Sequence, residues 1–216
     1  MSLAKLAKFF ILLQGKGITS MDENIDFFKI EHNDILPDKG KILVSEPFLQ
    51  DAYFKRSVVL LTEHNDDGTL GLVLNNPIEF NTSEILKDFP DIDASVGIGG
   101  PVHTDTVHYL HCMGDMIPES THVLGPVFFG GDFEMVRTLI KTNELTGNNI
   151  RFFVGFSSWH PGQLAREIAE NSWLVTTLDH ESVMQGKGDE LWKNVLLNEE
   201  RKYQMWTRYP EDPMMN

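Results

Sequence analysis

The stretch Ile150-Arg-Phe-Phe-Val-Gly-Phe-Ser-Ser-Trp-His-Pro-Gly-Gln-Leu164 gives the clearest indication of how the chain folds. Its first five residues are β-branched, aromatic or long, a composition typical of a strand buried on both faces. From Gln163 onward the apolar residues follow a helical period, and Pro161 is placed as a first-turn residue. Gly155 and Gly162 tolerate backbone angles that other residues avoid. The stretch therefore predicts a strand, then a turn over residues 155–162, then a helix.

Length and composition predict one folded domain. The chain has 216 residues, of which 41% are hydrophobic, enough for one sizeable core and too few for two ordinary domains with a linker. Residues 1–20 are expected to be an N-terminal appendage, poorly ordered or a short helix, because their apolar run is too short for a secretory signal. Residues 21–216 are then the single domain, with Met21 as an alternative start.

Charge and cysteine content narrow the function classes. The formal net charge is −14, which repels a phosphate backbone, so direct nucleic-acid binding is not expected. A single cysteine rules out an intrachain disulfide and predicts a reducing, cytoplasmic location. No stretch approaches the roughly 20 apolar residues that span a bilayer.

The remaining pattern predicts strands in hairpins mixed with separate helices, which is an α+β fold. The best-supported unit is an antiparallel hairpin of Ser57–Glu63 and Thr69–Asn75, joined by a turn that ends in Asp67-Gly68. A helix over Thr82–Phe89 is expected to be capped by Ser83 and stopped by Pro90. Other expected strands are Lys41–Ser45, Thr106–Cys112, His122–Phe129 and Trp173–Leu178. Other expected helices are one that Gly131-Asp132-Phe133 opens and that runs through Lys141, and one from Gly188 to Leu197.

Five motifs together resemble one family. They are Lys41-Ile-Leu-Val-Ser-Glu-Pro-Phe, Phe54-Lys-Arg-Ser-Val-Val-Leu-Leu, Gly71-Leu-Val-Leu-Asn-Asn-Pro, Gly99-Gly-Pro-Val and Gly155-Phe-Ser-Ser-Trp-His-Pro-Gly-Gln-Leu. In this order and spacing they are similar to the YqgE/AlgH family, also called UPF0301 or DUF179, from about Gly40 to the C-terminus. The resemblance implies a bent, largely antiparallel (mixed) sheet approaching a pseudo-barrel, with several helices packed around it.

The family carries an inherited label of transcriptional regulator, and its function is poorly established. Two positions depart from the family pattern. Asn76 stands where a basic residue is common, and Ala165 stands where an acidic residue commonly follows Gln-Leu. A charged role at these two positions is therefore not carried over to this chain.

Three residue types in the chain are candidate nucleophiles or bases. Ser157 and His160 lie close in sequence, and Cys112 is the one thiol. Catalysis would also need an orienting carboxylate and an oxyanion hole, and the segment lacks the Gly-x-Ser-x-Gly elbow. The alternative is that the serines bond local backbone and that Trp159 fills a groove, which is the interpretation we favour.

The histidines around Cys112 form the densest collection of metal-ligand types. In a strand, His108 and Cys112 share one face and His111 points to the other, so the set is divided. No spacing matches a structural zinc site. We therefore expect neither a metal nor a cofactor.

Six residues are candidate ligand or partner contacts. Trp159 offers a flat surface, and Gln163 donates and accepts hydrogen bonds at the start of a helix. Arg56 and Glu63 flank or end the first hairpin strand, where they pair with each other, are exposed to solvent or bind a ligand. Asn75 either caps the end of a strand or binds a ligand. Gly100 belongs to a tight glycine turn over residues 97–102.

Two functions stay open. The first is a non-enzymatic binding or regulatory module that recognises an unidentified protein or small-molecule ligand through the turn at Trp159–Gln163. The second is an enzyme acting on a small substrate at Ser157, Trp159 and His160. A hydrogen bond from His160 to both Ser157 and a carboxylate would favour the enzyme.

Overall fold

The computed structural model describes residues 35–49, 51 and 53–210 of the chain. The expected appendage over residues 1–20 lies outside these residues, as does the end of the chain from residue 211. None of the helices within the described residues combines the length and the apolar character needed to cross a membrane.

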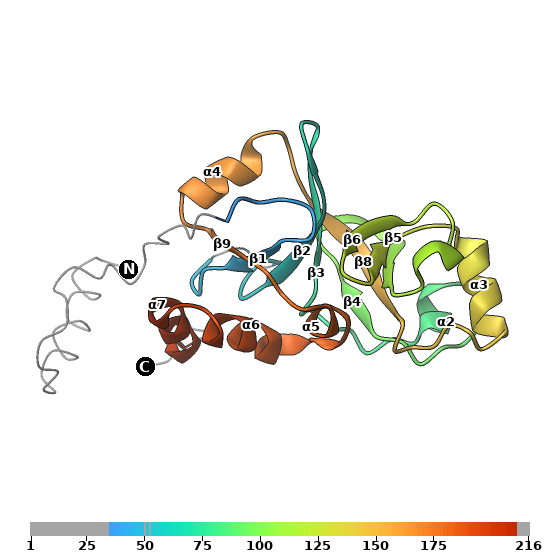
Figure 1. Ribbon diagram of the computed structural model, residues 1–216. Coiled ribbons are helices and arrows are strands. Elements are labelled where there is room, and N and C mark those ends of the chain that lie inside the picture. The colour runs from blue at the N-terminus through green and yellow to red at the C-terminus, as the bar shows by residue number, and fades with distance from the viewer. Residues whose placement is uncertain (1–34, 50, 52, 211–216) are drawn as a thin grey trace, which may run out of the picture.

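Nine strands within the described residues form one sheet (Figure 1). Its order is β6-β7-β5-β8-β3-β2-β1-β9, and β4 pairs with β8 beside this path. The strands are β1 Ile42–Ser45, β2 Val58–Asn65, β3 Gly68–Val73, β4 Val96–Ile98, β5 Val102–His111, β6 Thr121–Leu124, β7 Val127–Phe129, β8 Ile150–Trp159 and β9 Trp173–Thr176. Each described pairing is antiparallel except that of β4 with β8.

Strand β8 joins the two halves of the sheet. Its first half pairs with β5 and β4, and its last residues, Ser157–Trp159, pair with β3. The sheet bends but does not close, because β6 and β9 are its two ends. The end strand β6 nevertheless approaches the start of β1: a methyl group added to Gly40 would lie 2.6 Å from the carbonyl oxygen of Val123. The expected α+β fold with a bent, largely antiparallel sheet is confirmed.

The helices lie on three sides of this sheet (Figure 1). Helix α4 covers one face of the β1–β2–β3 half, α5 to α7 lie along its other face, and α2 and α3 lie at the far end, around β4 and β5. Their bounds are α2 Thr82–Ile85, α3 Phe133–Lys141, α4 Gln163–Ala169, α5 His180–Gln185, α6 Gly188–Leu197 and α7 Arg201–Gln204.

Packing on both faces explains why β1 and β2 are apolar at every position over Ile42–Val44 and Val58–Leu61. Ile42, Val44, Val58 and Leu60 pack in the cluster that holds the buried side of α6, including Leu191, Trp192 and Val195. Their neighbours on the other face pack in a second cluster with Trp159, Leu164 and Trp173, beneath α4. Since successive strand residues point to opposite faces, a strand covered on both sides must be apolar at every position.

Helix α3 begins as the sequence predicts. The Asp132 carboxylate accepts hydrogen bonds from the backbone N–H groups of Glu134 (2.8 Å) and Met135 (3.2 Å), which have no partner within the helix. Its buried residues, Val136, Leu139 and Ile140, pack in a third apolar cluster with Phe89 and Phe152.

Several expected element boundaries are wrong. The helix expected over Thr82–Phe89 is only the four residues of α2, and its N-cap is Asn81, not Ser83. The strand expected over His122–Phe129 is two strands, because the chain turns at Gly125 between β6 and β7. Part of the expected glycine turn over residues 97–102 is strand β4 and the start of β5.

The turn expected over residues 155–162 is also wrong for most of its length. Gly155 to Trp159 belong to β8, and the chain leaves the sheet only at His160. Helix α4 begins at Gln163, with Gly162 as its N-cap at a φ of 74°, so Pro161 precedes the helix. Gly155 also has a positive φ, 66°, but it turns the strand without ending it.

Candidate functional site

The residues around the end of β8 are held together by one carboxylate. Glu167 on α4 accepts the indole N–H groups of Trp159 (2.9 Å) and Trp173 (2.8 Å) on one oxygen. Its other oxygen accepts the Gln163 amide at 2.9 Å, and the Gln163 oxygen accepts the backbone N–H of His160 at 3.0 Å. Both Trp159 and Gln163, expected as contacts, therefore use their polar groups inside the protein.

Trp159 lies in the core. Its side chain is 4% exposed, and its ring stacks on Phe54 with centroids 5.9 Å apart and meets Trp173 edge to face. This environment favours the groove-filling role over a contact with a partner, because a buried indole presents little surface. Neither of the two cavities described below is lined by Trp159.

The structure does not assemble the candidate nucleophiles into a catalytic set. The Ser157 hydroxyl is fully buried and donates to the Gly99 carbonyl oxygen at 3.0 Å. Within the described residues, no hydrogen bond links His160 to Ser157 or to a carboxylate. Cys112 is half-buried after β5, and burial raises the pKa of its thiol, which disfavours the reactive thiolate.

Arg56 and Glu63 are not paired with each other. The Arg56 guanidinium is 5% exposed, donates to the Tyr209 carbonyl oxygen at 2.6 Å and lies over the Trp192 ring at 5.1 Å. Glu63 is exposed and accepts a hydrogen bond from the Asn65 amide at 2.7 Å. Arg56 thus joins the segment before β2 to the C-terminal helices.

Asn75 and Gly100 are placed by close backbone packing. The Asn75 amide accepts the Val58 N–H and donates to the Arg56 carbonyl oxygen, both at 2.8 Å, which fixes the end of β3 against the start of β2. A methyl group at Gly100 would lie 2.3 Å from the Phe156 carbonyl carbon. The glycine is therefore required where two strands cross, whatever else it contacts.

The histidines of β5 are distributed on different faces, as expected. His108 lies between the rings of Phe129 and Phe156, at 6.0 and 5.3 Å, whereas His111 is fully buried and stacks on Phe128. Burial lowers the pKa of both histidines. In the described part of the chain, no three His, Cys, Asp or Glu residues are grouped so that they could hold a metal ion.

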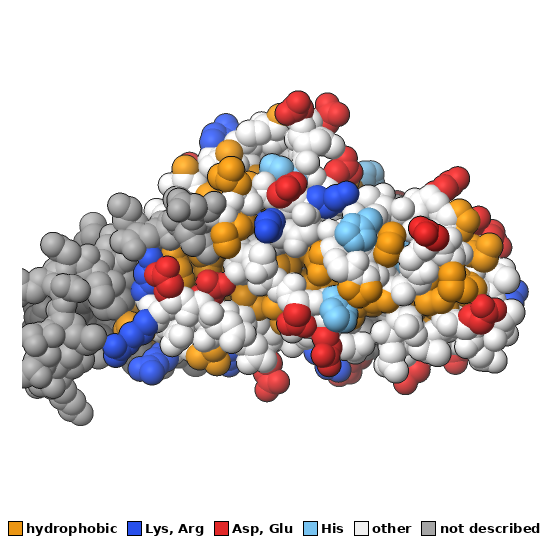
Figure 2. Space-filling view, viewed as in Figure 1, with side chains coloured by type: hydrophobic (Ala, Val, Ile, Leu, Met, Phe, Trp, Pro, Cys, Tyr) orange, Lys and Arg blue, Asp and Glu red, His pale blue; other side chains and the backbone are white. Residues whose placement is uncertain are grey.

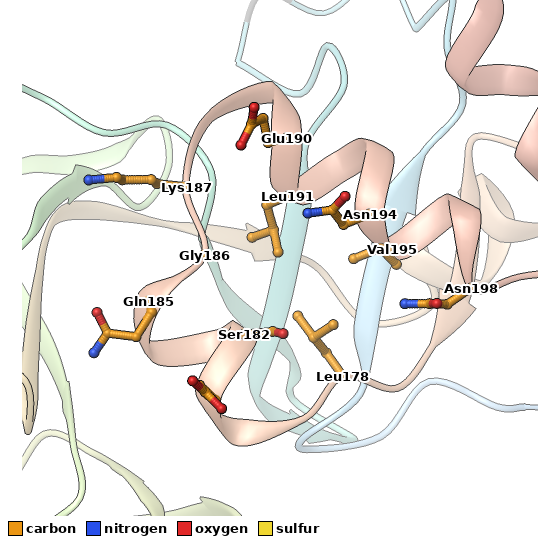
Figure 3. Close-up of a pocket in the computed structure, with 11 residues that line it drawn as sticks. Leu178, Ser182, Gln185, Gly186, Lys187, Glu190, Leu191, Asn194, Val195 and Asn198 are labelled. Carbon is orange, nitrogen blue, oxygen red and sulfur yellow. The ribbon is translucent and has the colours of Figure 1, made fainter.

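A cleft of about 390 Å³ lies between α5 and α6, and we call it the α5–α6 cleft (Figure 3). Leu178, Leu191 and Val195 form its apolar floor and point into the space between the two helices. Its rim is polar or charged and consists of Glu181, Ser182, Gln185, Lys187, Glu190, Asn194 and Asn198. An apolar floor with a few polar groups around it is the usual composition of a ligand site.

Most of the rim has hydrogen-bonding groups that no atom of the described residues uses. The side chains of Glu181, Glu190, Asn194 and Asn198 are exposed and form no hydrogen bond with another described residue. Ser182 and Gln185 are the exceptions, since the Ser182 hydroxyl donates to the Asp179 carboxylate at 2.8 Å and the Gln185 amide donates to the Asn148 carbonyl oxygen at 3.4 Å. Lys187 points away from the floor of the cleft (Figure 3).

The two helices of the cleft meet at a narrow bend. A methyl group on Gly186 would lie 2.5 Å from the Ser182 carbonyl oxygen and 2.6 Å from a Leu191 methyl carbon. Gly188 follows at a φ of 62°, in the left-handed region that favours glycine. These two glycines let α6 begin close against the end of α5.

Helix α5 is attached to the sheet by a buried arginine. The Arg151 side chain, on β8, is 1% exposed and donates to the carbonyl oxygens of Val183 on α5, at 2.8 Å, and of Leu74 after β3. Burial lowers its pKa to about 10, so the guanidinium stays charged at neutral pH. Its partners are carbonyl dipoles, and no carboxylate lies within ion-pair distance in the described residues.

A second cavity, of about 220 Å³, lies on the other side of the first turn of α6, and we call it the Asn75 cavity. It is lined by Tyr53, Lys55, Ser57, Val73, Asn75, Asn76 and Asp189. Asp189 and Glu190 are adjacent on α6 but line different cavities. Asn75 is the one residue expected as a contact that lines either of them.

Acidic side chains dominate the surface around these sites. Figure 2 shows the largest group of Lys and Arg side chains at the α7 end of the visible face, with Asp and Glu side chains spread over the rest. Basic residues in that region include Arg201 and Lys202 on α7 and Arg208 just beyond it. The distribution agrees with the net charge of −14.

Comparison with known proteins identifies relatives of this chain. A family model described as AlgH-like matches residues 42–204. A UPF0301 protein from Bacteroides thetaiotaomicron is 40% identical over 197 residues, covering 91% of this chain and 100% of that relative. A UPF0301 protein from Parabacteroides distasonis is 38% identical and covers 88% of this chain and 98% of the relative.

Two solved structures share the fold. A crystal structure of a protein from Corynebacterium diphtheriae superposes with a TM-score of 0.69 at 23% identity, covering 88% of this chain and all of that one. The solution structure of the AlgH protein from Pseudomonas aeruginosa has a TM-score of 0.63 at 26% identity, covering 74% of this chain and 89% of that one.

Proposed function

The chain belongs to the AlgH-like family, and we propose that it is a non-enzymatic binding module whose α5–α6 cleft holds a basic peptide segment of a partner protein. The observation that carries the proposal is the cleft itself, an apolar floor beneath acidic and amide side chains, most of which form no hydrogen bond or ion pair with another described residue. We also propose that the module acts in the cytoplasm, because a chain with a single cysteine forms no intrachain disulfide and so does not depend on an oxidising compartment.

The occupant follows from shape and charge. The floor of Leu178, Leu191 and Val195 offers room for one or two aliphatic side chains, since a volume of about 390 Å³ falls in the range of small ligand sites. Glu181 and Glu190 on opposite helices favour a lysine or arginine on either side of that anchor. The amides of Asn194 on α6 and Asn198 just after it form no hydrogen bond with another described residue and can bond the peptide backbone, which always carries donors and acceptors.

An enzymatic role at Ser157, Trp159 and His160 receives less support. The Ser157 hydroxyl is buried against Gly99, and the arrangement with His160 and a carboxylate that would favour an enzyme is missing from the described residues. Binding needs no such arrangement, and the acidic rim supports it directly.

A peptide array tests the proposal. The full chain is labelled and applied to short peptides that vary in aliphatic and charged residues. We expect the retained peptides to combine Leu, Ile or Val with Lys or Arg, and we expect the variant Glu181→Gln/Glu190→Gln to lose them. The matched control is Glu144→Gln/Glu170→Gln, which removes two exposed glutamates that do not line the cleft. Retention of acidic peptides, or equal retention by both double variants, would contradict the proposal.

A further inference from the structure

Two residues of opposite charge line the Asn75 cavity without forming an ion pair with each other. Lys55 lies in the turn before β2, and Asp189 lies in the first turn of α6. Both line the same cavity, yet neither side chain forms an ion pair or a hydrogen bond with another described residue. Because the two side chains do not pair with each other, each can form a charge-assisted hydrogen bond with an opposite charge on a ligand.

The lining of the Asn75 cavity is polar, and two of its side chains are held by hydrogen bonds. Asn75 is 9% exposed and fixed by its bonds to Val58 and Arg56, and Ser57 is 2% exposed with its hydroxyl donated to the Phe54 carbonyl oxygen. Each of these groups still has hydrogen-bonding capacity, because an amide nitrogen carries two hydrogens and a hydroxyl oxygen also accepts. The side chains of Tyr53 and Asn76 form no hydrogen bond with other described residues. The lining can therefore bond a small polar ligand.

We propose that the Asn75 cavity binds a small free α-amino acid in its zwitterionic form, with the ligand carboxylate on Lys55 and the ligand ammonium on Asp189. The size agrees, since about 220 Å³ is below the roughly 300–1,000 Å³ of sites for drug-sized molecules. Val73 is the one aliphatic residue of the lining, so the ligand side chain is small, as in glycine, alanine or serine. The site is separate from the α5–α6 cleft and does not depend on the peptide proposal.

Chemical-shift titration of the ¹⁵N-labelled full chain tests this site with three probes. They are L-alanine, L-alaninamide, which lacks the carboxylate, and N-acetyl-L-alanine, which lacks the ammonium. We expect L-alanine to shift the amides of Lys55, Asn76 and Asp189 saturably, with a Kd of about 1 mM or lower. Each modified probe should bind at least about tenfold more weakly, because it loses one charge-assisted hydrogen bond.

Variants show whether the two charges hold the ligand. Lys55→Met and Asp189→Asn should each weaken L-alanine binding about tenfold while leaving thermal unfolding unchanged, because both side chains are exposed and neither pairs with another described residue. Glu144→Gln is the control, since this exposed carboxylate lines neither cavity, and it should bind L-alanine as the parent does. The proposal is overturned by the absence of saturable shifts, by equal binding of the three probes, or by full binding in Lys55→Met or Asp189→Asn.

Discussion

The guanidinium of Arg151 on β8 donates a hydrogen bond of 2.8 Å to the carbonyl oxygen of Val183 on α5. That carbonyl lies in the last turn of α5, where backbone oxygens have no partner inside the helix. The buried Arg151 side chain therefore attaches α5, which forms one wall of the α5–α6 cleft, to the sheet. The charge is stabilised by the carbonyl oxygens it bonds and by the ring of Phe153, whose centroid is 5.1 Å away.

Replacing Arg151 with methionine tests this attachment. We expect Arg151→Met to lower the free energy of unfolding by roughly 2–4 kcal/mol, because the carbonyl oxygens of Leu74 and Val183 stay buried without a donor. Urea denaturation followed by circular dichroism measures it. Arg166→Met, at an exposed position on α4, is the control and should stay within about 0.5 kcal/mol of the parent. Equal stability of the two variants would mean that Arg151 does not hold α5.

The local signals of the sequence were sufficient for part of the fold. The hairpin of β2 and β3 was predicted because its turn contains Asp67-Gly68 between two apolar runs, and its pairing is confirmed. Helix α6 was predicted with its bounds, because Leu191, Val195 and Leu196 recur on one face. In both elements the apolar period and the burial pattern coincide.

Other elements depend on contacts that no local pattern reveals. Helix α5 was missed, although Asp179 accepts the Ser182 N–H at 2.8 Å and its N-cap could have been recognised. The predicted end of strand β8 is too early, because Gly155 and the serines after it resemble a turn. In the structure, Ser157 and Ser158 pair with β3 and so remain in the sheet. Tertiary pairing overrides weak strand propensity there.

The candidate site was the least predictable part. Large and polar residues beside glycines suggest a binding lip, which is why the sequence favours Trp159 and Gln163 as contacts. In the structure, both side chains donate hydrogen bonds to the Glu167 carboxylate inside the protein. The α5–α6 cleft carries no motif, since it arises where two helices pack at an angle around Gly186. That α5–α6 packing is tertiary and could be recognised only in the folded structure.

The carboxylate of Glu167 should be important for stability. We expect Glu167→Gln to lower the free energy of unfolding by about 1–3 kcal/mol, because an amide keeps one acceptor oxygen while Trp159, Trp173 and Gln163 all donate to this position. Denaturation followed by tryptophan fluorescence measures it. Glu170→Gln, exposed at the end of α4, is the control. A loss no larger than that of the control would show that the indoles find other partners.

His111 should make stability depend on pH. The backbone N–H of Met113 donates to its Nδ1 at 3.2 Å, so Nε2 carries the proton and donates to the Gly130 carbonyl oxygen at 3.1 Å. Burial lowers its pKa, so the unfolded chain takes up a proton first as pH falls, and stability present above about pH 6.5 is lost below it. His108, whose pKa is also lowered, acts in the same direction.

Unfolding in urea between pH 7.5 and pH 5 measures this dependence. His111→Gln should flatten the decline, because an amide can accept from Met113 and donate to Gly130 without titrating. His180→Gln, at an exposed position, should leave the decline unchanged. A decline that is equally steep in parent and His111→Gln would assign the pH dependence to other groups.

Duplex DNA should not be a specific ligand. With a net charge of −14, the protein should bind it with a Kd no tighter than the roughly 10⁻⁶ M of non-specific complexes, and added salt should abolish that binding. Fluorescence anisotropy with labelled duplexes measures it. A Kd of about 10⁻⁸ M or lower at physiological salt would restore direct DNA recognition.

The central claim is that the α5–α6 cleft, and not the turn at residues 160–163, is where a partner binds. The most direct measurement is a chemical-shift map of the ¹⁵N-labelled full chain with the best basic peptide from the array. We predict that the shifted amides cluster at Ser182, Gly186, Glu190 and Asn194, and that Leu191→Ala weakens the binding. Shifts confined to His160–Gln163, or a peptide that binds Leu191→Ala as tightly as the parent, would contradict the account.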